Sequence, residues 1–150
     1  MPSPPSDAKA MAGAVARHAL RGFLAADGTV DLTPRGRPVV SVLVLAHNRA
    51  EVTLACLQSL ALRLNRTPVE VIVLDNASRD DTPALLSRVR GATVVRSDEN
   101  VGFPRGVNQA AEFDRGDYLL LLNNDTEVLG RSIDVAVDHL RAFSDVGAVG

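Results

Sequence analysis

The sequence contains little cysteine and few aromatic residues. It has one cysteine in 150 residues, no tryptophan, and only 3% aromatic residues. A single cysteine cannot form an internal disulfide, so the class of disulfide-stapled secreted domains is excluded. The net charge of -2 and the few aromatic rings provide neither the basic surface nor the stacking platforms of a nucleic-acid binder. We expect no nucleic-acid partner.

Long apolar runs are also missing. The densest cluster, Tyr118 to Leu122, ends at Asn123, whereas a membrane-spanning helix needs about 20 apolar residues. The prolines and charges of Met1 to Lys9 leave no room for the continuous apolar stretch of a signal peptide. Cys56 lies among leucines and is interpreted as a small core residue in a reducing compartment. We therefore expect a cytoplasmic protein, which can be peripheral at the inner face of the cell membrane.

With 46% hydrophobic residues, the chain can form one compact domain with a real core. Residues 1–38 are expected to form a Pro/Ser-rich disordered start through Ser6, an amphipathic helix through about Ala25, and a linker. Met11, Val15, Ala19 and Phe23 give the helical spacing, and the turn residues Pro34 to Pro38 mark the linker. The domain proper is expected over residues 39–150.

Apolar runs typical of strands alternate with helical patterns from Val39 onward. Such alternation predicts an α/β fold, a Rossmann-like parallel sheet with buried strands and helices on both faces. The expected strands are Val39–Ala46, Val69–Leu74, Ala92–Arg96, Tyr118–Leu122 and one beginning at Val146–Val149. Four helices are expected between them: one that carries Val52, Cys56 and Leu60, one from an N-cap at Thr82 to Gly91, one over Val107–Phe113, and one that carries Ile133, Val137 and Leu140.

Polar stretches follow four of the expected strands. In open α/β sheets ligands bind beyond the carboxyl ends of the strands, so these stretches should converge on one edge. They are Ala46–Arg49, Asp75–Asp80, Asn100–Gly106 and Asn123–Thr126.

Asp75 ends an aliphatic run, where a carboxylate can accept hydrogen bonds from a ribose hydroxyl or a base. A turn or a helix cap explains an acid at this place equally well, and it explains Asn76, Ser78 and Asp80 better than a ligand role does.

Asp125 follows the strand Tyr118–Leu122, together with the amides of Asn123 and Asn124. Mg²⁺ needs only one or two protein carboxylates when substrate phosphates complete its shell, so a lone aspartate is chemically sufficient. The alternative is a polar turn without a ligand.

The stretch from Asn100 to Gly106 leads into a helix whose free N–H groups and Arg105 are candidates for phosphate binding. A tight turn is the alternative and is favoured for this stretch taken alone. Arg49 taken alone is best explained as a solvated side chain, and His47 has no neighbouring histidine or cysteine that would make it a metal ligand.

Taken together and in this order, the four stretches resemble the motifs of family 2 glycosyltransferases with the GT-A fold, most closely the rhamnosyltransferase-like branch. The resemblance covers about Val39 to Gly150. It implies transfer of a sugar from a UDP-, dTDP- or GDP-linked donor to a glycan or lipid-linked acceptor. It also implies that Asp125 is the metal-binding acid, with Mg²⁺ or Mn²⁺ as the cofactor. The family's metal-binding motif is Asp-x-Asp, and Asn123 stands here in the place of its first acid.

The donor pocket implied by the resemblance contains Ala46, His47, Asn48, Arg49, Asp75, Asn76, Gly102, Phe103, Arg105, Asn123 and Asn124.

The mechanism implied by the resemblance is inverting: a carboxylate base deprotonates the acceptor hydroxyl, which attacks the anomeric carbon. The family places this base on a later segment, so we expect it beyond Gly150. Asp134, Asp138 and Asp145 are interpreted as solvated surface charges. We also expect the sheet to be incomplete at its C-terminal side, with an apolar edge. For this reason the 150 residues alone are expected to bind donor weakly or not at all and to transfer no sugar.

Other functions fit less well. A dinucleotide-dependent oxidoreductase needs a glycine-rich turn after the first strand, and Ala46–Arg49 has no glycine. A nucleotidyltransferase would normally show a Gly- and Lys/Arg-rich loop there. A non-catalytic fragment, or one chain of a split enzyme completed by a second chain, stays open as the alternative.

Overall fold

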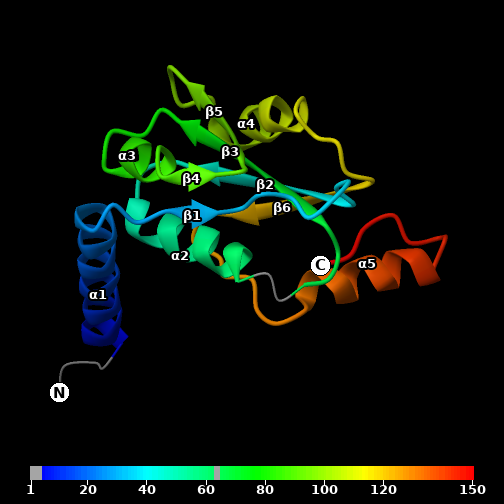
Figure 1. Cartoon of the computed structure of the whole chain (residues 1–150), viewed down its shortest axis with the longest axis horizontal. Helices are drawn as coiled ribbons and strands as arrows, with labels where there is room; N and C mark the ends of the chain where they lie inside the picture. Colours follow the sequence, from blue (N-terminus) through cyan, green and yellow to red (C-terminus); the bar gives the residue numbers. More distant parts are fainter. Residues whose placement is uncertain (1–4, 63–64) are drawn as a thin grey trace.

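The computed structural model describes residues 5–62 and 65–150, which form an α/β fold (Figure 1). Strands and helices alternate along most of the chain, as the apolar pattern predicts. The elements in chain order are α1 Pro5–Ala25, β1 Val30–Asp31, β2 Val40–Ala46, α2 Ala50–Ala61, β3 Val69–Asn76, α3 Thr82–Leu86, β4 Val89–Arg90, β5 Thr93–Ser97, α4 Gly102–Ala111, β6 Tyr118–Asn123 and α5 Ser132–Ala142.

The main sheet has four parallel strands in the order β5-β3-β2-β6. Because these strands are parallel, their carboxyl ends lie on the same side of the sheet, the left side in Figure 1. The register places Asp75 opposite Ala46 on one side of β2, and Asn123 opposite Leu45 on the other.

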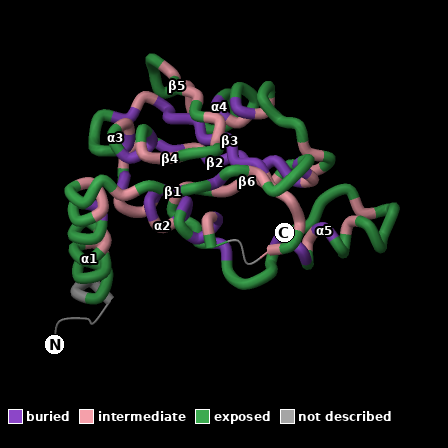
Figure 2. Tube along the Cα trace, in the orientation of Figure 1, coloured by how far each residue is buried: buried purple, intermediate pink, exposed green. Residues whose placement is uncertain are grey.

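Two apolar clusters cover the two faces of the sheet. One face packs against α2, α3 and α5, with Val42, Val44 and Leu57 fully buried at its centre. The other face packs against α4 through Leu43, Ile72, Leu74 and Ala110. Figure 2 shows the buried residues concentrated in β2 and β3. The predicted arrangement, a parallel sheet with helices on both faces, is confirmed.

Only the central strands are buried on both faces. Both β5 and β6 alternate between partly buried and exposed residues, so the prediction of full burial is wrong for these two. They are the edge strands of the sheet formed by the described residues, and Leu119 and Leu121 of β6 are each 51% exposed.

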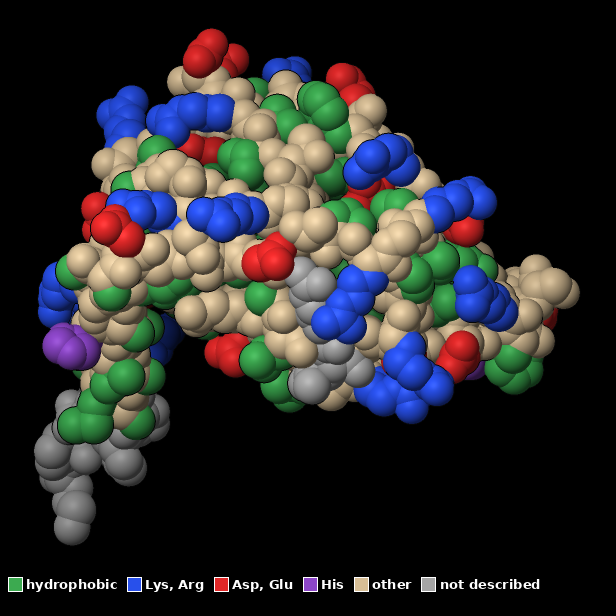
Figure 3. Space-filling model, viewed as in Figure 1, with side chains coloured by type: hydrophobic (Ala, Val, Ile, Leu, Met, Phe, Trp, Pro, Cys, Tyr) green, Lys and Arg blue, Asp and Glu red, His purple; other side chains and the backbone are tan. Residues whose placement is uncertain are grey.

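The N-terminal segment packs on the same core as the sheet. Leu20 of α1 and Val30 and Leu32 around β1 are buried in the cluster that contains α2. Strand β1 pairs in parallel with β4, although its residues lie in a stretch that the sequence analysis interpreted as turn and linker. The first turns of α1 project away from the sheet (Figure 3). Met11 and Val15 of α1 are exposed. Residues 1–4 of the expected disordered start lie outside the described residues, whereas Pro5 and Ser6 begin α1.

Three predicted boundaries are wrong. The N-cap position of α3 is Asp81 rather than Thr82, and the side chain of Asp81 makes no capping hydrogen bond. The helix ends at Leu86, because β4 follows before Gly91. Helix α4 begins at Gly102, five residues before the predicted start. Residues 146–149 form no strand, since apolar residues alone do not make a strand without a neighbour to pair with.

Two buried carboxylates fix the amino-terminal edge of the sheet. Glu70 on β3 accepts hydrogen bonds from Ser41 and from the backbone and side chain of Arg115. Burial raises the pKa of Glu70, but the hydrogen bonds from Ser41 and Arg115 outweigh this effect, and the pKa lies below its ordinary value.

Asp134 is the second buried carboxylate, and its prediction as a solvated surface charge is wrong. It is 3% exposed and lies in the first turn of α5. Its oxygens accept hydrogen bonds from Thr67, Arg131 and the backbone N–H of Arg66. Burial opposes ionisation, but these donors prevail, and the pKa of the carboxyl falls well below its usual range. Asp134 thereby ties α5 to the segment that precedes β3.

Asp134→Asn should lower the free energy of unfolding by about 2 to 3 kcal/mol at pH 7, because an amide replaces an acceptor that holds several donors. Since the folded pKa lies below the unfolded value of about 4, this stabilisation is complete above pH 4 and is lost progressively as the pH falls below it. Urea unfolding at pH 7 and pH 3 measures the difference in free energy of unfolding between wild type and variant. This difference should be smaller at pH 3 than at pH 7. Asp138→Asn, at an exposed position on the same helix, should change stability by less than about 0.5 kcal/mol. A difference between Asp134→Asn and wild type that is equal at both pH values would contradict the role of the ionised carboxylate.

Candidate functional site

The polar stretches that follow β2, β3, β5 and β6 come together at the carboxyl edge of the sheet. Hydrogen bonds join three of them directly: Asn48 contacts the stretch after β3, and Asn76 contacts the stretch after β5. Asn124, after β6, donates to the oxygen of Thr53 on α2 at 2.8 Å and contacts the carbonyl of Asn48 at 3.5 Å. The edge is therefore one connected polar surface.

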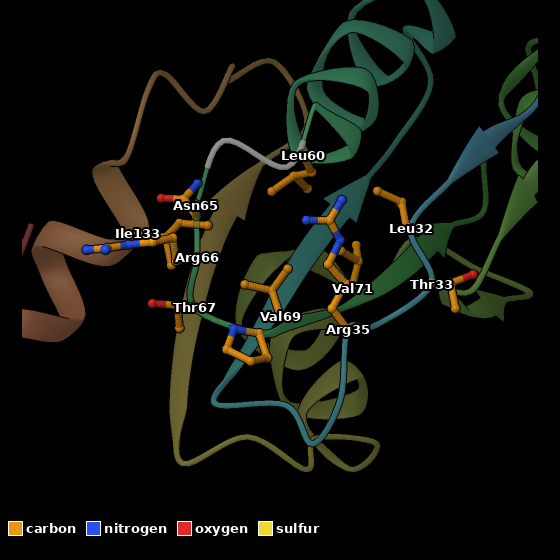
Figure 4. Close-up of a pocket in the computed structure, with 11 residues that line it drawn as sticks. Leu32, Thr33, Arg35, Leu60, Asn65, Arg66, Thr67, Val69, Val71 and Ile133 are labelled. Atoms are coloured by element: carbon orange, nitrogen blue, oxygen red, sulfur yellow. The ribbon is translucent and has the colours of Figure 1, made fainter.

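The cavity in Figure 4 lies at the opposite, amino-terminal side of the strands. It has a volume of about 40 Å³ and is lined by apolar side chains such as Leu60 and Val71, together with Arg35 and Arg66. This volume accommodates about one to three water molecules and is too small for a nucleotide. It is not the candidate site.

Strained backbone is concentrated at the carboxyl edge. Asn48, Arg49 and Ala77 have φ values of 56°, 58° and 59°, in the left-handed region that disfavours residues with a Cβ. Side chains hold these turns: the N–H of Asn48 donates to the oxygen of Ser78, and the oxygen of Asn48 accepts from the N–H of Arg79. Residues held in such conformations cluster at functional sites.

Asp80 caps two helices at once. Its carboxylate accepts from the N–H of Ala50, the first residue of α2, and from the N–H of Thr82, the first residue of α3. Burial raises the pKa of Asp80, and the hydrogen bonds that it accepts lower it further than burial raises it. The predicted cap role of Asp80 is confirmed, and so is the turn role of Ser78, whose N–H donates to Asp75.

Asp75 is almost fully buried, and both its oxygens have partners. One accepts from the N–H of Ser78, and the other lies 2.9 Å from the guanidinium of Arg96 on β5. The same guanidinium donates to the carbonyl of Ser78. Arg96 is half exposed, so it covers Asp75 and at the same time presents a cation to solvent at the carboxyl edge.

His47 and Asn76 hold the stretches after β2 and β3 together. The Nδ1 atom of His47 lies 2.8 Å from the carbonyl oxygen of Asn76, and the amide of Asn48 lies 3.3 Å from Nε2. Nδ1 donates in the first contact, since a carbonyl can only accept. Both ring nitrogens are then occupied by protein groups.

The N-terminus of α4 offers fewer free N–H groups than the sequence analysis expected. The N–H groups of Val101 and Gly102 already donate to Asn76 and Asn100, and Pro104 has none. Phe103 and Arg105 are exposed on the first turn of the helix. Phosphate binding here would therefore rest mainly on the Arg105 side chain.

Asp125 lies on the segment after β6, with its side chain half exposed. The guanidinium of Arg49 is 3.8 Å from this carboxylate and 4.0 Å from that of Glu51. In the part of the chain that the structure describes, no three His, Cys, Asp or Glu side chains gather as a metal site. One carboxylate with an adjacent amide fits a divalent cation only when phosphate oxygens complete the coordination.

Cys56 lies beneath this segment and is fully buried. Burial, with smaller contributions from the negative charges of Asp125 and Glu127, raises the pKa of its thiol to about 12. The thiol is therefore protonated at neutral pH and can donate to the carbonyl of Asn123, 3.8 Å away. The predicted core position of Cys56 is confirmed.

Residues 41–150 match the family model described as glycosyl transferase family 2. The chain belongs to this family. It is 33% identical over 120 residues to the O-antigen biosynthesis protein RfbC of Myxococcus xanthus, covering 77% of this chain and 9% of that protein. It is 31% identical over 121 residues to the succinoglycan biosynthesis protein ExoO of Rhizobium meliloti, covering 71% and 34%. The chain thus spans about a third or less of these relatives.

Solved structures share the fold. The mannosyltransferase PcManGT from Pyrobaculum calidifontis, solved with GDP-Man and Mn²⁺, superimposes with a TM-score of 0.61 at 24% identity, over 89% of this chain and 42% of that one. TarS from S. aureus in complex with UDP gives a TM-score of 0.58 at 22% identity, over 69% and 32%. The predicted GT-A fold and the family are confirmed, whereas the rhamnosyltransferase-like branch stays a prediction.

Two residues that matter at the carboxyl edge, Arg96 and Thr53, are not predicted from the sequence. Arg96 pairs with Asp75 only because β5 lies next to β3 with these two residues in register. Thr53 resembles any helical residue in the sequence, yet its hydroxyl joins α2 to Asn124. Neither position is marked by a local motif, because strand pairing and helix packing create both contacts.

The Asp75–Arg96 pair should be energetically coupled. A double-mutant cycle with Arg96→Gln and Asp75→Asn should give a coupling energy of about 1 to 2 kcal/mol in urea unfolding, because one partner is buried. The matched pair Arg37–Asp117 has a 3.0 Å contact but is exposed on both sides. Its cycle should give less than about 0.5 kcal/mol. Equal coupling energies in the two cycles would rule out a special role for the buried carboxylate.

Proposed function

We propose that this chain forms the donor-binding part of a glycosyltransferase that moves a sugar from a nucleoside diphosphate donor to a glycan or lipid-linked acceptor. The observation that carries the proposal is the convergence of two carboxylates, Asp75 and Asp125, on one edge of a parallel sheet. Each carboxylate has an arginine beside it, Arg96 and Arg49. The names of the relatives, which act in O-antigen and succinoglycan biosynthesis, support a polysaccharide product.

In this proposal the nucleoside lies over the end of β3. Asp75 and Arg96 would face the base or ribose together. The arginine would donate hydrogen bonds, and the carboxylate would accept them through the lone pairs that Ser78 and Arg96 leave free. Asn48 and Asn76 hold the turns on either side. UDP-, GDP- and dTDP-linked donors all remain candidates. TarS with UDP and PcManGT with GDP-Man show that this fold accommodates two different bases.

The diphosphate would lie between Arg49 and Asp125. Without donor, the guanidinium of Arg49 partly neutralises Asp125 across 3.8 Å. With donor, the same guanidinium can donate to phosphate oxygens, which frees the carboxylate to hold Mg²⁺ or Mn²⁺. When bound, the cation stabilises the negative charge on the leaving diphosphate.

Inversion requires a carboxylate that takes the acceptor proton from the opposite side of the sugar. We propose that this base belongs to a segment that residues 1–150 do not include, either downstream in the same protein or on a second chain. The coverage of the relatives, about a third or less of their length, supports this assignment. That residues 1–150 alone bind donor weakly or not at all and transfer no sugar stays a prediction of the same proposal.

Calorimetric titration of the chain with UDP, dTDP and GDP, with and without Mn²⁺, tests the donor site. One nucleotide should bind more tightly with Mn²⁺, and Asp125→Asn should remove this gain, because the amide cannot supply the charge that the cation needs. Asp145→Asn, at another exposed position, should leave the gain unchanged.

A Mn²⁺-dependent gain that survives in Asp125→Asn would remove Asp125 from the metal site. Because residues 1–150 alone are expected to bind donor weakly or not at all, absence of binding contradicts the donor site only if a longer form of the protein that extends past Gly150 also binds none of the three nucleotides.

A further inference from the structure

One face of α2 carries three small polar side chains that lie under the segment bearing Asp125. Thr53, Cys56 and Ser59 are spaced at i, i+3 and i+6, so they line one side of the helix. All three are buried. In Figure 1 the segment that leaves β6 toward α5 runs alongside α2. We call these three residues the α2 ledge.

Each residue of the α2 ledge contacts the segment 123–128. The Asn124 amide donates to the hydroxyl oxygen of Thr53 at 2.8 Å. The Cys56 thiol lies 3.8 Å from the Asn123 carbonyl. The backbone N–H of Val128 donates to Ser59 at 2.9 Å. The ledge thus fixes the segment before and after Asp125, whose own side chain is half exposed.

Thr53 has a second hydrogen bond that leads to the other half of the site. Its hydroxyl donates to the carbonyl of Arg49 at 3.3 Å while accepting from Asn124. Since a hydroxyl has one proton to donate, this pair of contacts orients it fully. Arg49 is the left-handed cap of α2 whose guanidinium faces Asp125. One buried hydroxyl therefore links the backbone of Arg49 to the neighbour of Asp125.

We propose that Thr53 is a positioning residue that, through Asn124, sets the distance between Asp125 and Arg49 and so prepares the site for a metal-bound diphosphate. Cys56 and Ser59 extend the same support along the segment. The inference rests on the proposed donor site, and it adds residues that contact neither donor nor metal. Groups behind a metal ligand commonly change metal affinity by about 10 to 100-fold when they are removed.

Thr53→Val removes the hydroxyl and keeps the shape of the side chain, and Thr53→Ser keeps the hydroxyl. Thr67→Val is the matched control: it also loses a hydroxyl hydrogen bond, 2.7 Å to Asp134, at the opposite edge of the sheet. Two readouts separate positioning from general destabilisation. One is nucleotide affinity with and without Mn²⁺, for UDP and GDP. The other is the rate at which the thiol reagent DTNB modifies Cys56, the single cysteine of the chain.

The factor by which Mn²⁺ raises nucleotide affinity should be about tenfold smaller in Thr53→Val than in wild type. Nucleotide affinity without Mn²⁺ should stay within about twofold of wild type. Cys56 should react faster in this variant, because the loosened segment uncovers it. Thr53→Ser should resemble wild type in both readouts. Thr67→Val should keep the Mn²⁺-dependent gain and show slower Cys56 modification than Thr53→Val.

Failure of the inference and failure of the proposed function give different results. If Cys56 is as well protected in Thr53→Val as in wild type, or if affinity falls equally with and without Mn²⁺, the positioning role is wrong. If wild-type affinity does not respond to Mn²⁺ at all, the proposed metal site is wrong, and the Cys56 readout alone then decides whether Thr53 holds the segment.

Discussion

The parallel register between β2 and its neighbours is the constraint on which the carboxyl edge depends. Backbone hydrogen bonds place Asp75 opposite Ala46, Arg96 opposite Asp75, and Asn123 opposite Leu45. A shift of one residue in any pairing would turn the side chains of that strand to the other face. The buried valines and leucines of β2 and β3 prevent such a shift, because each face packs against its own apolar cluster. The core therefore positions the polar residues, although it contains none of them.

Hydrogen bonds to carboxylate acceptors then fix the loops that the sheet brings together. Asp80 caps α2 and α3, and Asp75 holds Ser78 and Arg96. Corresponding acids, Glu70 and Asp134, tie down the amino-terminal side. Asp125 has a half-exposed side chain that faces the guanidinium of Arg49 at 3.8 Å. In the proposed donor site, this carboxylate exchanges its arginine partner for a divalent cation.

The strands and the edge residues could be predicted from the sequence because both depend on local pattern. Runs such as Val40–Ala46 are apolar at successive positions, and the polar residues that end them necessarily reach the edge of a parallel sheet. Asp134 was misjudged because its neighbours Arg66 and Thr67 are distant in sequence and only the packing of α5 brings them together. The same reason hides Arg96 and Thr53. Strand β1 has two residues, too few to show a period.

The central claim is that the stretches after β2, β3, β5 and β6 form one nucleotide site, and paramagnetic broadening by Mn²⁺ tests it most directly. Backbone amide signals of the isotope-labelled chain would be recorded with nucleoside diphosphate and substoichiometric Mn²⁺, which detects even weak binding. Amides of residues 46–49, 75–78, 100–103 and 123–126 should broaden together, while those around Thr67 at the opposite edge stay sharp. Broadening confined to one of these stretches, or centred elsewhere on the molecule, would contradict the account.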